Sequence, residues 1–210
     1  MIAILDYGAG NTRSVLRAFA AVDADARLVS GAEGLGAADR LVVPGVGAAG
    51  SAVEALMANG LWEPARAWGL AGRPLLGVCL GAQLLLDGSD EGDAPGLGLV
   101  RGRCRAFPTP EAGGPRQVPH IGWNEVRTRT GGRFDAYFVH GYWPDAESAA
   151  VAGTTTVDRF TFPSLLRRGS LSGTQFHPEK SGPVGRAILR AFATGRLDGV
   201  PAGVRQELPA

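Results

Sequence analysis

At 210 residues, the chain is long enough for a single domain with a sizeable core. A formal net charge of +1, with 45% hydrophobic and 20% charged residues, argues against broad electrostatic binding to nucleic acid or to a membrane surface. No apolar segment approaches the roughly 20 residues of a membrane-spanning helix, and the N-terminus lacks the basic region of a signal peptide. The two cysteines, Cys79 and Cys104, are too few for a disulfide framework. We therefore expect a cytoplasmic protein, in which the thiol of Cys79 stays free.

Strand-like and helix-like patterns alternate through the first half of the chain. We expect strands over residues 2–6, 27–29, 41–43 and 74–78, and helices over residues 11–21, 51–59 and 62–70. A further helical pattern, over residues 82–86, directly follows the fourth strand. This alternation predicts an α/β fold with an open, mostly parallel sheet and helices on both faces.

The second half changes character. Residues 87–98, rich in Gly, Asp and Pro, are expected to form a surface loop. Short β runs over residues 122–126, 136–139, 149–155, 164–168 and 171–175 then favour antiparallel pairing. A final helix over residues 183–193 begins with proline and ends before Gly195. We predict one domain over residues 1–195 and a flexible tail over residues 196–210.

The most informative segment is Gly77-Val78-Cys79-Leu80-Gly81, at a strand-to-helix junction. In a nucleophile elbow the turn is so tight that neighbouring positions hold only glycine, and the nucleophile lies near the N-terminus of a helix, which favours a thiolate. A buried core cysteine is the commoner situation, but it needs no flanking glycines. Cys104 has no such context, and we interpret it as structural or incidental.

A base and an orienting carboxylate follow much later in the chain, at His177 and Glu179. Residues two apart share one face of an extended segment, and Pro178 between them indicates a strand end or edge. Glu179 is then placed to orient the imidazole while His177 acts on the thiol. A lone histidine is more commonly structural, and we interpret His120 and His140 in that way.

Two glycine-rich turns complete the candidate site. Residues 43–47, Val-Pro-Gly-Val-Gly, follow a strand and can present N–H groups to an oxyanion, together with the amide of Leu80. An ordinary βα turn explains that loop equally well. The turn over residues 6–13 fails as a dinucleotide site because Arg13 stands where the third glycine is required. No phosphate loop and no zinc or calcium spacing is present, so we expect neither a metal nor an organic cofactor.

With these residues identified, the chain resembles the class I glutamine amidotransferases and, among them, the glutaminase subunits of imidazole glycerol phosphate synthases. Residues 77–83 and 173–179 carry the resemblance to the class. Residues 6–11, 44–47, 118–124, 137–140 and 179–181 carry the resemblance to these subunits. The similarity extends from Ile4 to about Phe192 and implies a flavodoxin-like fold.

The resemblance also implies a role for each matching residue. Cys79 would be the nucleophile, His177 the general base and acid, and Glu179 the residue that orients it. Gln83, one helical turn past the nucleophile, would hold the substrate glutamine. The oxyanion would be surrounded by Val46, Gly47 and Leu80. The face that docks a (β/α)₈ cyclase subunit, giving a heterodimer, would lie at or near Asn11, His120, Trp123, Tyr137 and Lys180.

The implied reaction is hydrolysis of L-glutamine to L-glutamate and ammonia through a cysteinyl thioester. The cyclase would use the ammonia to form imidazole glycerol phosphate and aminoimidazole carboxamide ribotide in histidine biosynthesis. Two alternatives stay open: a glutaminase that serves another synthase, such as anthranilate or guanylate synthesis, and a non-catalytic redox-sensing or chaperone-like protein. The chain departs from the family pattern at Ala48 and Ala49, at Gly141 and at Gly182. These departures concern the outer lining of the glutamine pocket.

Overall fold

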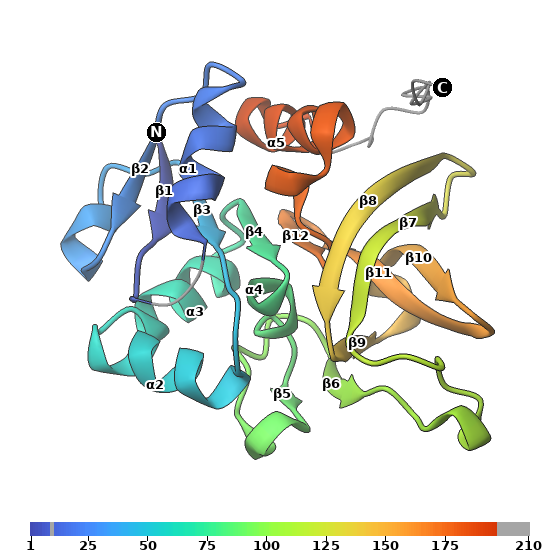
Figure 1. Ribbon diagram of the computed structural model, residues 1–210. Helices are drawn as coiled ribbons and strands as arrows, with labels where there is room; N and C mark the ends of the chain where they lie inside the picture. The colour runs from blue at the N-terminus through green and yellow to red at the C-terminus, as the bar shows by residue number, and fades with distance from the viewer. Residues whose placement is uncertain (9–10, 197–210) are drawn as a thin grey trace.

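A computed structural model describes residues 1–8 and 11–196 of the chain. Its main element is a nine-stranded sheet in the order β2-β1-β3-β4-β12-β11-β10-β7-β8, beside a three-stranded sheet in the order β5-β6-β9 (Figure 1). The strands of the first half are β1 (Ile2–Leu5), β2 (Ala26–Val29), β3 (Arg40–Val43) and β4 (Leu75–Val78). They are mutually parallel, as the alternating pattern predicts.

Helices cover both faces of this parallel half, which confirms the predicted fold class. On one face lie α1 (Thr12–Ala20) and α5 (Gly182–Thr194), and on the other α2 (Ala49–Ala58) and α3 (Trp62–Leu70), at the top and bottom of Figure 1. Alternate strand residues supply the two cores: Ile4 packs with Phe19 of α1 and Phe192 of α5, and Leu5 belongs to the core that contains Leu56 of α2 and Trp62 of α3. Gly195, in the left-handed conformation with φ 75°, ends α5 at the predicted place.

The antiparallel half lies on the right of Figure 1. It contains β7 (His120–Thr128), β8 (Arg133–His140), β10 (Val151–Val157), β11 (Phe160–Arg168) and β12 (Leu171–Thr174). Neighbouring strands in this set pair antiparallel, as predicted. At its other edge β12 pairs parallel with β4, with Thr174 opposite Val78. The end of β12 therefore lies beside the residue that precedes Cys79.

The expectation of a simple surface loop over residues 87–98 is wrong. Within it, β5 (Gly88–Ser89) pairs with β6 (Gly102–Ala106), which in turn pairs with β9 (Tyr142–Ala146), while Ala94 and Leu97 are buried. Short 3₁₀ turns complete the fold: η1 (Ala32–Leu35), η2 (Glu91–Asp93), η3 (Pro110–Ala112), η4 (Ser148–Ala150) and η5 (Pro178–Lys180).

The helix predicted over residues 82–86 is also wrong, because α4 spans only Leu80–Gln83. The carbonyls of Leu84 and Leu85 accept hydrogen bonds from the N–H groups of Leu97 and Leu99, so they do not continue a helix. Leucines 84–86 are all buried, and burial rather than helical periodicity explains their run. A single turn has little macrodipole, so this argument for a Cys79 thiolate weakens.

Among the described residues, no helix is long and apolar enough to span a membrane. The predicted tail, apart from Arg196, lies outside the described residues.

Candidate active site

Cys79 occupies a strained turn between β4 and α4, as the elbow predicts. Its φ of 52° and ψ of −108° are unusual for a residue with a side chain. Its N–H donates to the carbonyl of Thr174 at 2.7 Å, which ties the turn to β12. A Cβ atom on Gly77 would lie 2.5 Å from the carbonyl oxygen of Gly81, and one on Gly81 would lie 1.8 Å from that of Val43. The two glycines are therefore required by close backbone contact.

A clamp of three hydrogen bonds among His177, Tyr137 and Ser181 holds His177 against β8. Its N–H donates to the carbonyl of Tyr137 at 2.9 Å, and its own carbonyl accepts from the hydroxyl of Ser181 at 2.6 Å. The same Ser181 oxygen accepts from the N–H of Tyr137 at 3.0 Å. This clamp fixes the backbone from which the imidazole projects.

Glu179 contacts His177 across the turn η5, not along an extended strand as the sequence suggested. The distance between Nδ1 of His177 and Oε1 of Glu179 is 2.8 Å, and both side chains are only 1% exposed. Asn11 donates to the same carboxylate oxygen at 3.4 Å. The expected pairing is therefore present, although a 3₁₀ turn produces it, since Pro178 begins that turn.

The second ring nitrogen of His177, Nε2, is not engaged by Glu179. Within the described residues, Nε2 is buried and has no hydrogen-bond partner of ordinary geometry. Burial opposes the charged imidazole, but the hydrogen bonds and negative charges of Cys79 and Glu179 outweigh it and raise the pKa of His177 to about 9. Approach of Nε2 to the Cys79 thiol stays a prediction.

Two glutamine side chains meet beside the sulfur. Nε2 of Gln175 donates to Sγ of Cys79 at 3.6 Å, and Oε1 of Gln175 accepts from Nε2 of Gln83 at 2.9 Å. Gln83, predicted to hold substrate, also donates to the carbonyl of Tyr142 at 3.1 Å. Sequence reasoning assigned no role to Gln175, and the available signal was its place two residues before His177. Cys79 itself is 5% exposed.

The glycine loop that follows β3 packs against the elbow. A Cβ atom on Gly45 would lie 2.7 Å from Cβ of Leu80, so this loop and the residue after the nucleophile are in contact. Val46 and Gly47 form the exposed tip of the loop, and Gly47 has a φ of 94°. The contact with Leu80 is made by Gly45, and the oxyanion role of Val46, Gly47 and Leu80 stays a prediction.

Both ends of this loop are anchored. The Tyr7 hydroxyl donates to the carbonyl of Pro44 at 2.7 Å, and the Glu91 carboxylate accepts from the N–H of Ala49 at 2.8 Å. Burial, together with the charge of Cys79, raises the pKa of Tyr7, so its hydroxyl stays a donor. Neither Tyr7 nor Glu91 was singled out from the sequence.

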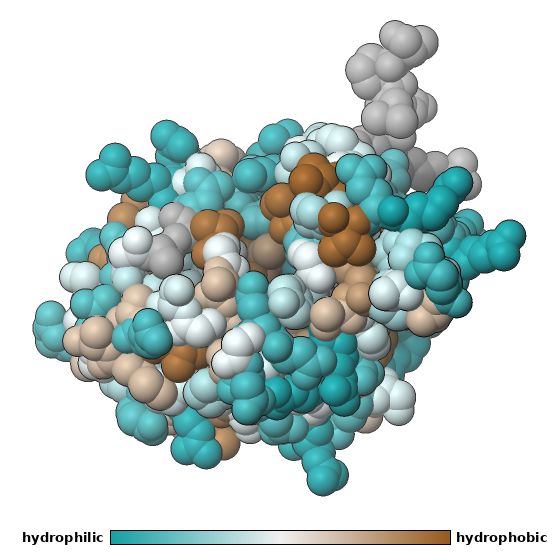
Figure 2. Space-filling view, turned by 60° about the horizontal axis from the view of Figure 1, so that its bottom comes forward, coloured by the Kyte–Doolittle hydropathy of each residue, from teal (hydrophilic) through white to brown (hydrophobic). Residues whose placement is uncertain are grey.

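The residues predicted to dock a partner fall into two groups. Trp123 and Tyr137 stack edge to face with ring centroids 6.1 Å apart, Lys180 Nζ lies 5.6 Å from the Tyr137 ring, and Trp123 is 53% exposed. His120, in contrast, is buried and offers little surface, while Asn11 contacts Glu179. Figure 2 shows separate apolar patches among hydrophilic residues on the face turned toward the viewer.

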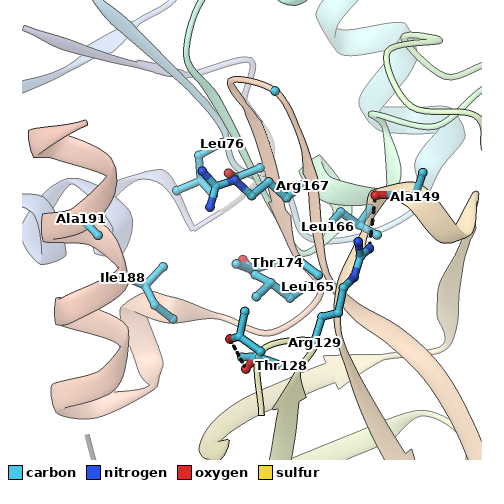
Figure 3. Close-up of a pocket in the computed structure, with 14 residues that line it drawn as sticks. Leu76, Thr128, Arg129, Ala149, Leu165, Leu166, Arg167, Thr174, Ile188 and Ala191 are labelled. Carbon is cyan, nitrogen blue, oxygen red and sulfur yellow. Dashed lines mark hydrogen bonds between the residues drawn. The ribbon is translucent and has the colours of Figure 1, made fainter. Parts of the chain in front are cut away.

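A cavity of about 390 Å³ lies between α5 and the antiparallel strands. Ile188 of α5 points across it toward Leu165 and Thr174 (Figure 3). Cys79 does not line this cavity, so we do not assign it to the reaction. In the part of the chain that the structure describes, no three His, Cys, Asp or Glu side chains are grouped to hold a metal ion.

Comparison with known proteins points to one family. The family model described as glutamine amidotransferase class-I matches residues 3–195. Imidazole glycerol phosphate synthase subunit HisH of Streptococcus sanguinis (strain SK36) is 43% identical over 200 residues, covering 91% of this chain and 95% of the relative. The subunit of the same name from Deinococcus radiodurans is 42% identical over 201 residues, covering 91% and 92%. A solved structure described as a glutamine amidotransferase superposes with a TM-score of 0.74 at 20% identity, covering 92% of this chain and 98% of that chain. That likeness concerns the fold.

Proposed function

This chain belongs to the class I glutamine amidotransferase family, and we propose that it is the glutaminase subunit of an imidazole glycerol phosphate synthase. It hydrolyses L-glutamine to L-glutamate and ammonia. The observation that carries the proposal is the buried His177–Glu179 contact, 2.8 Å long, beside an elbow cysteine. The identity of 43% to a subunit of that name supports the choice of synthase.

In the first half of the reaction, the Cys79 thiolate attacks the carboxamide carbon of glutamine. The carbonyl oxygen becomes an oxyanion, which the N–H of Leu80 and the loop at Val46 and Gly47 stabilise. The His177 imidazolium protonates the departing nitrogen, so ammonia leaves and a γ-glutamyl thioester remains on Cys79.

In the second half, His177 is neutral and removes a proton from water, which attacks the thioester carbon. The oxyanion forms again and collapses, the thiolate leaves, and glutamate is released. Glu179 holds the proton of His177 on Nδ1 throughout, so Nε2 faces the reacting atoms. The imidazolium formed in this step is ready for the next glutamine.

The ammonia is passed to a cyclase subunit in a heterodimer. Ammonia is mostly protonated in neutral water and then is no nucleophile, which favours direct transfer to a second active site. The exposed Trp123, with Tyr137 and Lys180 beside it, supports a docking face there, near the buried His120 and near Asn11. The product of the cyclase reaction and the cytoplasmic location of this chain stay predictions.

The test measures glutamate formation by the purified chain, alone and with the cyclase subunit and its nucleotide ligand. We expect weak activity alone and a large increase in the complex. Cys79→Ala should abolish glutamate release while the complex still uses added ammonia, and Cys104→Ala should behave as wild type. Full activity without a partner would contradict the coupling.

The same experiment separates the alternatives. Activation by an anthranilate or guanylate synthase component, and not by the cyclase, would assign the chain to another synthase. A redox-sensing or chaperone-like protein has no reason to react with glutamine. Labelling of Cys79 by an electrophilic glutamine analogue therefore excludes that class.

A further inference from the structure

The side chain of Gln175 joins the substrate-binding region to the nucleophile. It is 1% exposed and makes two hydrogen bonds, as a donor to Sγ of Cys79 at 3.6 Å and as an acceptor from Gln83 at 2.9 Å. A glutamine amide has a donor end and an acceptor end, and exchanging the two would reverse both contacts. Which end faces the sulfur therefore decides whether Gln175 favours or opposes a thiolate.

The carbonyl of Tyr142 determines the orientation of the Gln83 amide, and Gln83 in turn determines the orientation of Gln175. A carbonyl oxygen only accepts hydrogen bonds, so Gln83 must turn its NH₂ group toward Tyr142, at 3.1 Å. The second N–H of that same group then points at Gln175, whose oxygen must face it. If Gln175 were reversed, two NH₂ groups would face each other and its oxygen would face the sulfur. The N–H of Gln175 therefore faces Cys79.

The Tyr142 carbonyl is held in turn by a pair of histidines. Nδ1 of His140 lies 2.7 Å from this carbonyl and must donate to it, which leaves Nε2 of a neutral ring as an acceptor. Nδ1 of His120, 3.1 Å away, is then the donor to that nitrogen. Burial is the main cause that lowers the pKa of His140 to about 3, so the ring stays neutral at physiological pH.

Asn124 of β7 begins this row of hydrogen bonds. Its oxygen accepts from the N–H of Glu125 at 2.8 Å, so its NH₂ group is the end that lies 3.2 Å from Nε2 of His120. All hydrogen bonds in this row are then donated in one direction: from Asn124 to His120, from His120 to His140, and from His140 to the Tyr142 carbonyl. Asn124 directly follows Trp123 of the proposed docking face.

We propose that Gln175 is a further catalytic residue, whose N–H stabilises the sulfur of Cys79 as a thiolate. Gln83 acts as a positioning residue, because it fixes the direction of that hydrogen bond. His140 and His120 act as positioning residues through it, because they hold the Tyr142 carbonyl to which Gln83 donates. A hydrogen bond to a charged acceptor is about twice as strong as one to a neutral acceptor. The contact therefore favours the attacking thiolate and, in the second half-reaction, its departure from the thioester. The inference rests on the proposed function only in taking Cys79 as the nucleophile.

The test follows the rate at which iodoacetamide alkylates Cys79 across a range of pH, read by mass spectrometry of the Cys79 peptide. The full chain is used, alone and with the cyclase bound. Gln175→Met removes both hydrogen bonds, whereas Gln175→Glu keeps the acceptor for Gln83. Gln117→Glu, at an exposed position, is the matched control. Thermal unfolding shows whether each variant is folded. If Gln175→Met does not fold, the alkylation profile of Gln175→Glu decides the test.

We expect both Gln175 variants to alkylate about tenfold more slowly near neutral pH, a change that corresponds to about 1.4 kcal/mol, and to shift the pH midpoint upward. Gln117→Glu should match wild type. Wild-type alkylation by both Gln175 variants at every pH would overturn the catalytic role. Since alkylation needs no glutamine turnover, a changed profile in a chain without glutaminase activity would support this inference and contradict the proposed function instead.

His120 tests the positioning part. His120→Leu removes the donor to His140, while His120→Asn places an N–H close to the position of Nδ1. We expect the leucine variant to shift the alkylation profile in the direction of the Gln175 variants, and the asparagine variant to restore it. A wild-type profile for His120→Leu would overturn the positioning role.

Discussion

Nδ1 of His177 lies 2.8 Å from Oε1 of Glu179, and neither side chain is more than 1% exposed. A carboxylate in this position accepts the Nδ1 proton and so leaves Nε2 as the atom that exchanges protons with the thiol and the substrate. Burial strengthens the contact because no water competes for either group. The orientation of the base in this site depends on that one carboxylate.

Replacing Glu179 by glutamine should lower kcat by about 10²- to 10⁴-fold, because an amide does not enforce the correct tautomer. The KM for glutamine should change little, since Glu179 faces the imidazole. Steady-state glutamate formation with the cyclase bound measures both constants. Glu54→Gln, the same change at an exposed position of α2, is the control. A loss of less than tenfold would show that Glu179 does not orient the base.

The charged ring of His177 is expected to stabilise the folded protein at low pH and to lose this effect at high pH. Its pKa is raised from near 6.5 to about 9, since Cys79 and Glu179 outweigh the opposing effect of burial. The stability that the charged ring contributes is therefore fully present below about pH 6.5 and is lost as pH rises through about 9. An NMR titration of the three histidines should show one ring with this high pKa, and Glu179→Gln should lower it. Titration of the His177 ring near 6.5 would contradict the charged pair.

Gly81→Ala should destabilise the fold by about 3 kcal/mol or more, because its methyl group would lie 1.8 Å from the carbonyl oxygen of Val43. Gly50 of α2 is a matched control, since a Cβ atom there meets nothing within 4 Å. Gly50→Ala should instead stabilise the protein by about 0.5–1 kcal/mol. Urea unfolding measures both changes. Similar stabilities for the two variants would contradict the close contact at the elbow.

Tyr7→Phe should loosen the glycine loop that follows β3, because the Tyr7 hydroxyl holds that loop at Pro44. The variant loses the buried hydrogen bond to the Pro44 carbonyl, which should cost about 1–3 kcal/mol of stability. The kcat should fall by up to about 10²-fold, the lower value for loss of one oxyanion donor. Chemical unfolding and glutaminase assays check the two effects. An unchanged kcat with reduced stability would show that Tyr7 supports the fold without positioning the loop.

The parts of the site that the sequence predicted are those with local signals. Gly77 and Gly81 flank the nucleophile within five residues, and His177 and Glu179 are two residues apart. Helices α1, α2 and α3 were similarly predictable, because each has buried residues three or four positions apart. Such patterns are read within one segment and need no knowledge of the tertiary structure.

The features that were missed depend on contacts between distant segments. Gln83 and Gln175 are 92 residues apart, and only the placement of β12 beside β4 brings them together. The leucines at 84–86 were predicted to be helical, but a segment that is buried on all sides is apolar throughout whether or not it is a helix. The strand β5 lies in a segment rich in Gly and Asp, whose composition is typical of loops. In each case tertiary packing overrides the local pattern.

The central claim, that Cys79 forms a γ-glutamyl thioester with help from His177, is tested most directly by acid quenching during turnover. The complex of the chain with the cyclase is mixed with glutamine, quenched, and analysed by intact and peptide mass spectrometry. We expect a γ-glutamyl adduct on the Cys79 peptide of the wild-type chain, and none on a Cys79→Ala chain. Glutamate formation at the wild-type rate by the Cys79→Ala chain would contradict the account.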